Sequence, residues 1–241
     1  MALDEALMDR ARRTGEWVLR VYSWLAPTIS LGRNQTARGR YDLERIRERG
    51  LEVVRRPTGG RAILHAREIT YSVTAPVDDA GSLRASYDRI NRLITTALVS
   101  LGVDAVAVSA KGHRHPSPGM SPCFDEPAAG EVTVSGRKLA GSAQWRNDGA
   151  LLQHGSILVA DDQTALADFT IGGGVAIPPP ATLTDLLSYV PSPEEMAGAL
   201  AGAVESLEGS AVQELSVENE VRARAEALVV RYLDDSWTWR L

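Results

Sequence analysis

The sequence predicts an α+β (mixed α/β) domain that ends in a mainly helical part. Strand and helix patterns alternate up to about residue 175, and the patterns that follow are helical. The chain has 241 residues, of which 44% are hydrophobic, so a core can form without disulfides. We therefore expect one domain over 1–241, with its core at 1–175 and a mainly helical part at 176–241.

The first half of the chain alternates between helices and strands. Apolar residues three and four positions apart predict a helix at 2–13 and a longer one from Leu83 to Leu101. A capping aspartate and a terminating glycine predict a short helix at 42–49. Aromatic and β-branched residues predict strands at 17–24, 28–31, 51–56 and 69–74.

The second half begins with alternating residues at 103–108 and then loses its periodicity at 111–122, which predicts a long loop. Strand patterns separated by turn residues predict a meander at 131–134, 137–146 and 150–160. Glycine and proline triplets between 172 and 180 predict a hinge-like connection. Two helices follow, one beginning at Pro193 and one at 217–233.

Charge and composition exclude several classes of protein. The formal net charge of −5 argues against non-specific nucleic-acid binding. No run reaches about 18 apolar residues, and the N-terminus lacks a secretory pattern, so we expect a cytoplasmic protein without a membrane partner. The single cysteine excludes an internal disulfide and a cysteine-based zinc site. The phosphate-binding loop, dinucleotide, zinc-protease and serine-hydrolase motifs are absent from the sequence.

The segment from Arg55 to His65, RRPTGGRAILH, combines two glycines with a concentration of positive charge. Glycines that follow a strand allow the backbone to approach a ligand closely. Arginine side chains in an acidic protein predict a site for an anionic partner or a phosphate group. A hairpin with basic flanks is an equally good interpretation. The arginines concerned are Arg55, Arg56, Arg61 and Arg67.

A second candidate site combines Cys123, in SPCFD, with Lys138, in GRKLAGSA. An ammonium group beside a thiol favours the thiolate, which is the nucleophilic form, so this pair would make an activated nucleophile if the fold brings it together. An inert cysteine is the alternative. His113 and His115 form an H-x-H in the long loop, which we interpret as solvated rather than as a metal site.

These blocks, together with MALDEA, LGRNQ and QHGS, resemble the biotin/lipoate protein ligase superfamily. Within it, the sequence is most similar to the cysteine-dependent octanoyltransferases of the LipM type. The resemblance implies mixed sheets flanked by helices. It also implies transfer of octanoate from octanoyl-acyl carrier protein to a lysine of lipoyl domains of 2-oxoacid dehydrogenase E2 or of the glycine-cleavage H protein. No cofactor, metal or ATP is needed, because a thioester already supplies the activated acyl group.

The resemblance also assigns residues. Cys123 matches the cysteine that carries the acyl thioester, and Lys138 matches the lysine of the family motif. His65 is followed by Ala66, where the family commonly has an acidic residue. The arginines would meet the acidic carrier or its phosphopantetheine phosphate, and the glycines would border an apolar acyl slot. The expected substrate-binding residues are Arg55, Arg56, Gly59, Gly60, Arg61, His65, Gly141 and Ser142.

Three alternatives stay open. The chain could be an amidotransferase that takes octanoate from the H protein, and such enzymes also use a cysteine. It could be an ATP-dependent lipoate ligase, which uses the motif lysine and needs no cysteine. It could also be a non-catalytic binding homologue, against which the intact pair of Cys123 and Lys138 argues.

Overall fold

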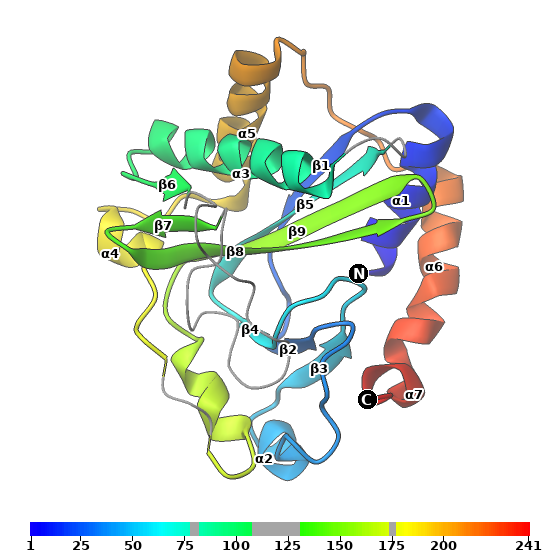
Figure 1. Ribbon diagram of the computed structural model, residues 1–241, viewed down its shortest axis with the longest axis vertical. Coiled ribbons are helices and arrows are strands. Elements are labelled where there is room, and N and C mark those ends of the chain that lie inside the picture. The colour runs from blue at the N-terminus through cyan, green and yellow to red at the C-terminus, as the bar shows by residue number, and fades with distance from the viewer. Residues whose placement is uncertain (78–81, 108–130, 174–176) are drawn as a thin grey trace.

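The computed structural model describes residues 1–77, 82–107, 131–173 and 177–241, and its strands form two sheets in this part of the chain (Figure 1). The larger sheet is antiparallel throughout. Its strand order is β1 (Val18–Tyr22), β5 (Glu68–Pro76), β9 (Ala150–Leu158), β8 (Arg137–Asn147), β7 (Val132–Val134) and β6 (Val106–Ala107). In the smaller sheet, the central strand pairs in parallel with one neighbour and antiparallel with the other. The order there is β3 (Glu52–Arg55), β2 (Thr28–Leu31) and β4 (Ile63–His65).

Helices cover both faces of the larger sheet (Figure 1). On one face lie α3 (Leu83–Ser100) and α5 (Pro193–Glu208), whose buried residues join those of the sheet in one core cluster. On the other face lies α1 (Ala2–Thr14), and α6 (Asn219–Leu233) packs along it. The short helices are α2 (Leu43–Glu48), the 3₁₀ helix η1 (Thr164–Phe169), α4 (Leu183–Leu186) and α7 (Asp235–Thr238). No helix in these described ranges is long and apolar enough to cross a bilayer.

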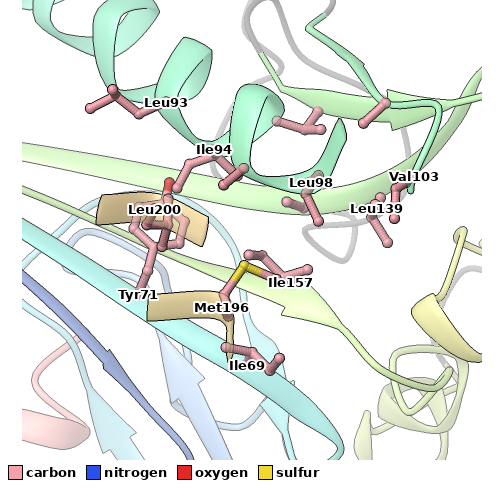
Figure 2. Packing of buried hydrophobic residues seen from close by; sticks show 14 of the residues in the cluster. Ile69, Tyr71, Leu93, Ile94, Leu98, Val103, Leu139, Ile157, Met196 and Leu200 are labelled. Carbon is pink, nitrogen blue, oxygen red and sulfur yellow. The ribbon is translucent and has the colours of Figure 1, made fainter. Parts of the chain in front are cut away.

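The main core lies between the larger sheet and the helix pair of α3 and α5 (Figure 2). Ile94 and Leu98, four positions apart, belong to one stripe of α3, and they join Ile157 of the sheet in one core cluster. Met196 of α5 fills the space beside them, and its side chain has no exposed surface. The stripe forms because residues three and four apart in a helix share one face.

Strand β9 is buried along its whole length, because helices lie on both sides of it. Leu151 and Ile157 belong to the core beneath α3, whereas Leu152 packs against Met8 of α1 on the opposite face. Successive strand residues point to opposite faces, so both faces need apolar residues. The same strand nevertheless contains polar residues, and these mark the position of the candidate site.

The fold confirms the predicted α+β class, with helices and strands at the positions where periodicity predicted them. The mixed pairing expected from the resemblance occurs only in the smaller sheet. Strand β4 and the short helices η1, α4 and α7 were not predicted. Each is six residues or shorter, so no periodic pattern can develop within it.

Candidate active site

The candidate site lies where the smaller sheet and the loop after β3 meet strand β9. The loop Pro57–Gly60 folds around the guanidinium of Arg56, which is 2% exposed. Arg56 Nη2 donates to the carbonyl oxygens of Gly59 at 2.8 Å and Arg61 at 2.7 Å, and Nη1 donates to the Ser30 carbonyl at 2.9 Å. Hydrogen bonds from a charged donor are stronger than neutral ones, so this side chain fixes the shape of the loop.

Two backbones meet closely at Gly32 and Gly60. A Cβ atom on Gly32 would lie 1.8 Å from the Gly60 carbonyl oxygen, so only glycine fits at that position. Gly60 itself has φ 92°, in the region that side chains rarely adopt. The amide of Arg33 also donates to the Thr58 carbonyl oxygen at 2.8 Å. The glycines of the motif therefore place their loop against the segment that follows β2.

Arg55 and Arg56 do not form the surface for an acidic carrier that we expected of them. Arg55 has no exposed surface, and its guanidinium donates to carbonyl oxygens of the protein, among them those of Gly32 and Thr238. Burial and the charges of Arg240 and Arg56 lower the pKa of Arg55 to about 10, so it stays charged at neutral pH. The sequence shows that these side chains are charged but not that they are buried. For this reason the prediction that they form a surface was wrong.

The other two arginines of the segment are also engaged by the protein. Arg61 is buried, with 9% of its surface exposed. Arg67 is exposed, but its Nη2 lies 2.8 Å from Asp162 Oδ1 and its backbone amide donates to the same carboxylate. On the N-terminal side of the motif, the nearest exposed arginines in the sequence belong to the loop before α2 and to α2 with its C-cap; they are Arg38, Arg40, Arg45, Arg47 and Arg49.

His65 lies inside the protein, at the end of β4. Its Nε2 is 2.7 Å from Ser30 Oγ and its Nδ1 is 2.7 Å from Glu68 Oε1. Its ring stacks on Trp24 at 4.2 Å. Ser30 Oγ also accepts a hydrogen bond from Arg56 Nη1 at 3.0 Å. Both ring nitrogens of His65 therefore contact protein side chains, and a direct polar contact between His65 and a substrate stays a prediction.

His154 of β9 joins the motif loop to the larger sheet. Its Nε2 lies 2.6 Å from Thr58 Oγ1, and the side chain is buried. Burial is the main cause that lowers the pKa of His154; Asp4 opposes it and the charge of Arg56 adds to it, and together these effects bring the pKa to about 3. The imidazole is therefore neutral at neutral pH.

This neutral imidazole predicts an acid-sensitive contribution to stability. The pKa of His154 is about 3 in the folded protein against a usual value of 6.5, so the unfolded chain binds the proton more readily. The unfolding free energy is therefore independent of His154 protonation above pH 6.5. It decreases as the pH falls toward 4, by up to about 1.4 kcal/mol per pH unit. His154→Gln should flatten the dependence of the unfolding free energy on pH between 6.5 and 4, measured by urea unfolding. Parallel curves for the two proteins would contradict this expectation.

Gly141 and Ser142 of β8 lie opposite Ser156 and Gly155 of β9. Ser142 Oγ is 2.6 Å from the hydroxyl of Tyr71, which lies over Gly155. A Cβ on Gly155 would lie 2.5 Å from the Gly141 carbonyl oxygen and 2.7 Å from the Tyr71 ring. The small residues of the motif thus leave room for a buried polar network, which also includes Asn91 and Gln153.

Lys138 lies at the start of β8, and its Nζ donates to Glu131 Oε1 at 2.6 Å. Both side chains are buried, with 2% and 6% of their surface exposed. Glu131 was not predicted as a site residue; it precedes β7, and the turn at Ser135 and Gly136 brings β7 back beside β8. The carboxylate offsets the lysine charge, so Lys138 acts here as a paired, oriented ammonium.

The other half of the predicted nucleophilic pair lies outside the described residues. This applies to Cys123 with the SPCFD block, and to His113 and His115. The activation of Cys123 by Lys138 therefore stays a prediction.

The fold and these motif blocks define a class of enzyme that catalyses protein lipoylation. The sequence model of the lipoyl protein ligase A/B catalytic domain matches residues 1–204, and the chain belongs to that family. Two relatives are named octanoyltransferase LipM. The protein from Kyrpidia tusciae is 38% identical over 100% of this chain and 93% of its own length. The protein from Moorella thermoacetica is 46% identical over 66% of this chain and 60% of its own length.

Solved structures show the same fold at lower identity. A lipoate-protein ligase A bound with ATP is 23% identical, has a TM-score of 0.80, and the match covers 99% of this chain and 92% of that one. A bipartite lipoate protein ligase from Thermoplasma acidophilum is 22% identical, with a TM-score of 0.77 and coverage of 99% and 89%. At this identity the likeness shows the fold alone.

Proposed function

We propose that this protein is an octanoyltransferase that moves octanoate from octanoyl-acyl carrier protein to a lysine of a lipoyl domain or of the glycine-cleavage H protein, through a thioester on Cys123. The observation that supports this most strongly is the 38% identity over the whole chain to a relative named octanoyltransferase LipM. The match extends over the whole chain and so spans the positions of the RRPTGGRAILH block, Cys123 and Lys138.

The proposed reaction has two steps. In the first, the Cys123 thiolate attacks the octanoyl carbonyl; the new carbon–sulfur bond forms, and the carrier thiolate leaves and takes a proton. In the second, the ε-amine of the acceptor lysine attacks the octanoyl-Cys123 thioester. An amide forms, the amine loses a proton, and the Cys123 thiolate is released. Exchange between thioesters is nearly neutral in free energy and amide formation is favourable, so no ATP is consumed.

The described residues would supply the surroundings of this reaction. Lys138, oriented by Glu131, would hold the thiolate or polarise the thioester carbonyl. Gly59 and Gly60 would border the acyl chain from one side, and Gly141 with Ser142 from the other. Arg56 would act indirectly, since its donors hold the carbonyl oxygens of the glycine loop.

A transfer assay separates this proposal from its alternatives. The protein is incubated with octanoyl-carrier protein and a lipoyl domain without ATP, and the intact masses of both proteins are followed. We expect the lipoyl domain to gain one octanoyl group on its lysine. Transfer only from octanoyl-H protein would identify an amidotransferase, and transfer only with free octanoate and ATP would identify a ligase. The absence of transfer in all three mixtures would identify a binding homologue.

A further inference from the structure

The last segment of the chain, from α6 onward, lies outside the residues that the family model matches, which end at 204. It contains none of the motif blocks that carry the family resemblance. In the structure α6 runs along α1, and α7 lies beside β3, next to the start of the glycine loop (Figure 1).

Arg55 connects this segment to the loop after β2. Its Nε donates to the carbonyl oxygen of Thr238 at 2.8 Å, whereas its Nη1 donates to the carbonyl oxygens of Gly32 at 2.6 Å and Gln35 at 2.8 Å. Trp237 Nε1 completes the connection by donating to the Arg55 carbonyl oxygen at 2.8 Å. Within the described residues, the Arg55 guanidinium donates to carbonyl oxygens of both segments, so its charge holds the two segments together.

The same segment holds the loop at further points. The amides of Ala37 and Arg38 donate to the Leu241 carbonyl oxygen at 2.8 and 2.9 Å. Arg240 Nη2 donates to the Arg33 carbonyl oxygen at 2.5 Å. The loop at 32–38 is thus attached at its start by Arg55 and Arg240, and at its end by Leu241.

If the loop at 32–38 were displaced, the glycine loop, Pro57–Gly60, would be displaced with it. Gly32 and Gly60 are in backbone contact, and the Arg33 amide donates to Thr58. Neither contact has a flexible side chain that could absorb a shift. The position of the glycine loop therefore depends on the segment from α6 onward, although the two are about 180 residues apart in the sequence.

We propose that residues 219–241 act, through Arg55, as a positioning element that sets the width of the acyl slot beside Gly59 and Gly60. The inference rests on the proposed function, because it assigns the slot to the acyl chain. Arg55 is a positioning residue in this scheme and does not contact the substrate. The consequence is selectivity for acyl length, since a slot with a displaced wall no longer distinguishes a long chain from a short one.

Arg55→Lys tests the proposal, because a lysine keeps the charge but lacks the planar fork that reaches two segments at once. The ratio of kcat/KM for octanoyl-carrier over butanoyl-carrier should fall about tenfold, the effect of losing one or two charge-assisted hydrogen bonds. Trp237→Phe keeps an aromatic ring but removes the hydrogen bond to the Arg55 carbonyl oxygen, so the ratio should fall about threefold. Trp17→Phe is the matched control, because Trp17 is 40% exposed and stacks under Arg89, away from the loop.

Hydrogen exchange supplies a measurement that does not need activity. Arg55→Lys should accelerate exchange about tenfold at the amides of Arg33, Ala37 and Arg38, relative to the wild type and to Trp17→Phe. Unchanged exchange at these amides would overturn the proposal whatever the enzyme does. Faster exchange with an unchanged acyl-length ratio would also overturn it, because the segment would then be structural only. If the wild type transfers no octanoate at all, the proposed function fails, and the exchange data still decide whether the segment positions the loop.

Discussion

Cys123→Ala is expected to abolish formation of an octanoyl-enzyme and to lower octanoyl transfer at least about a thousandfold. A reaction that proceeds through a covalent intermediate loses nearly all of its acceleration when the nucleophile is removed. Incubation of the wild type with octanoyl-carrier protein should add one octanoyl group, which hydroxylamine removes. Intact mass spectrometry of the two proteins, without ATP, measures both expectations.

The chain offers a simple control, because Cys123 is its only cysteine. Any thioester on the protein must therefore be on this residue, and Cys123→Ala must have no site for one. An octanoyl group that resists hydroxylamine, or one that appears equally on the variant, would place the acyl group on an amine or hydroxyl and would contradict the two-step mechanism.

Lys138→Met is expected to slow acylation of Cys123 by about a hundredfold, the usual effect of removing one oriented donor from a site where charge develops. The change also leaves Glu131 buried beside a thioether. Breaking a buried ion pair by removing one partner costs about 3–5 kcal/mol of stability, so the single variant mixes two effects. Urea unfolding measures the stability, and a single-turnover acylation assay measures the chemistry.

The structure supplies the variant that separates these effects. Lys138→Met with Glu131→Gln removes both charges of the pair that is joined at 2.6 Å. The double variant should recover most of the lost unfolding free energy, because no uncompensated charge stays buried. Its acylation rate should stay low. Recovery of the rate together with the stability would show that Lys138 is structural and that Cys123 does not depend on it.

Alkylation of Cys123 checks the same pair without substrate. If Lys138 favours the thiolate, the pH midpoint for reaction with iodoacetamide should be higher in the double variant than in the wild type. Superimposed profiles, with both proteins folded, would show that another group activates the thiol.

Much of the fold could be predicted because its elements are long enough to show a period. The stripe of α3, with Ile94 and Leu98, repeats over five turns, and every strand of the meander after residue 130 has a turn on its boundary. Strand β4 could not be predicted in this way. Its three residues become a strand only because β2 pairs with them, and that pairing is not visible in a local window.

The candidate site, too, could be predicted only in part. From Gly59 and Gly60 the sequence predicted a close approach of the backbone to a ligand, and this stays a prediction. The structure shows a different close approach, that of Gly60 to Gly32 in another segment. For Arg55 the sequence indicated charge and suggested a surface, whereas burial depends on α7, which lies far along the chain. Residue type predicts chemistry, but which residues meet depends on pairings across the whole chain.

The bond from Arg55 to Thr238 has a consequence for synthesis of the protein. The two residues are 183 positions apart, so at about 5–20 residues per second the ribosome needs about 10–40 s to make Thr238 after Arg55. During that interval Arg55 has no Thr238 carbonyl to meet, and the loop after β2 lacks its later attachments. A nascent chain can complete its larger sheet, whose last strand in the sequence is β9, before α7 is made, but the attachments of the glycine loop can form only when α7 has left the ribosome tunnel. The loop after β2 and the glycine loop therefore reach their full set of attachments later than the larger sheet is made.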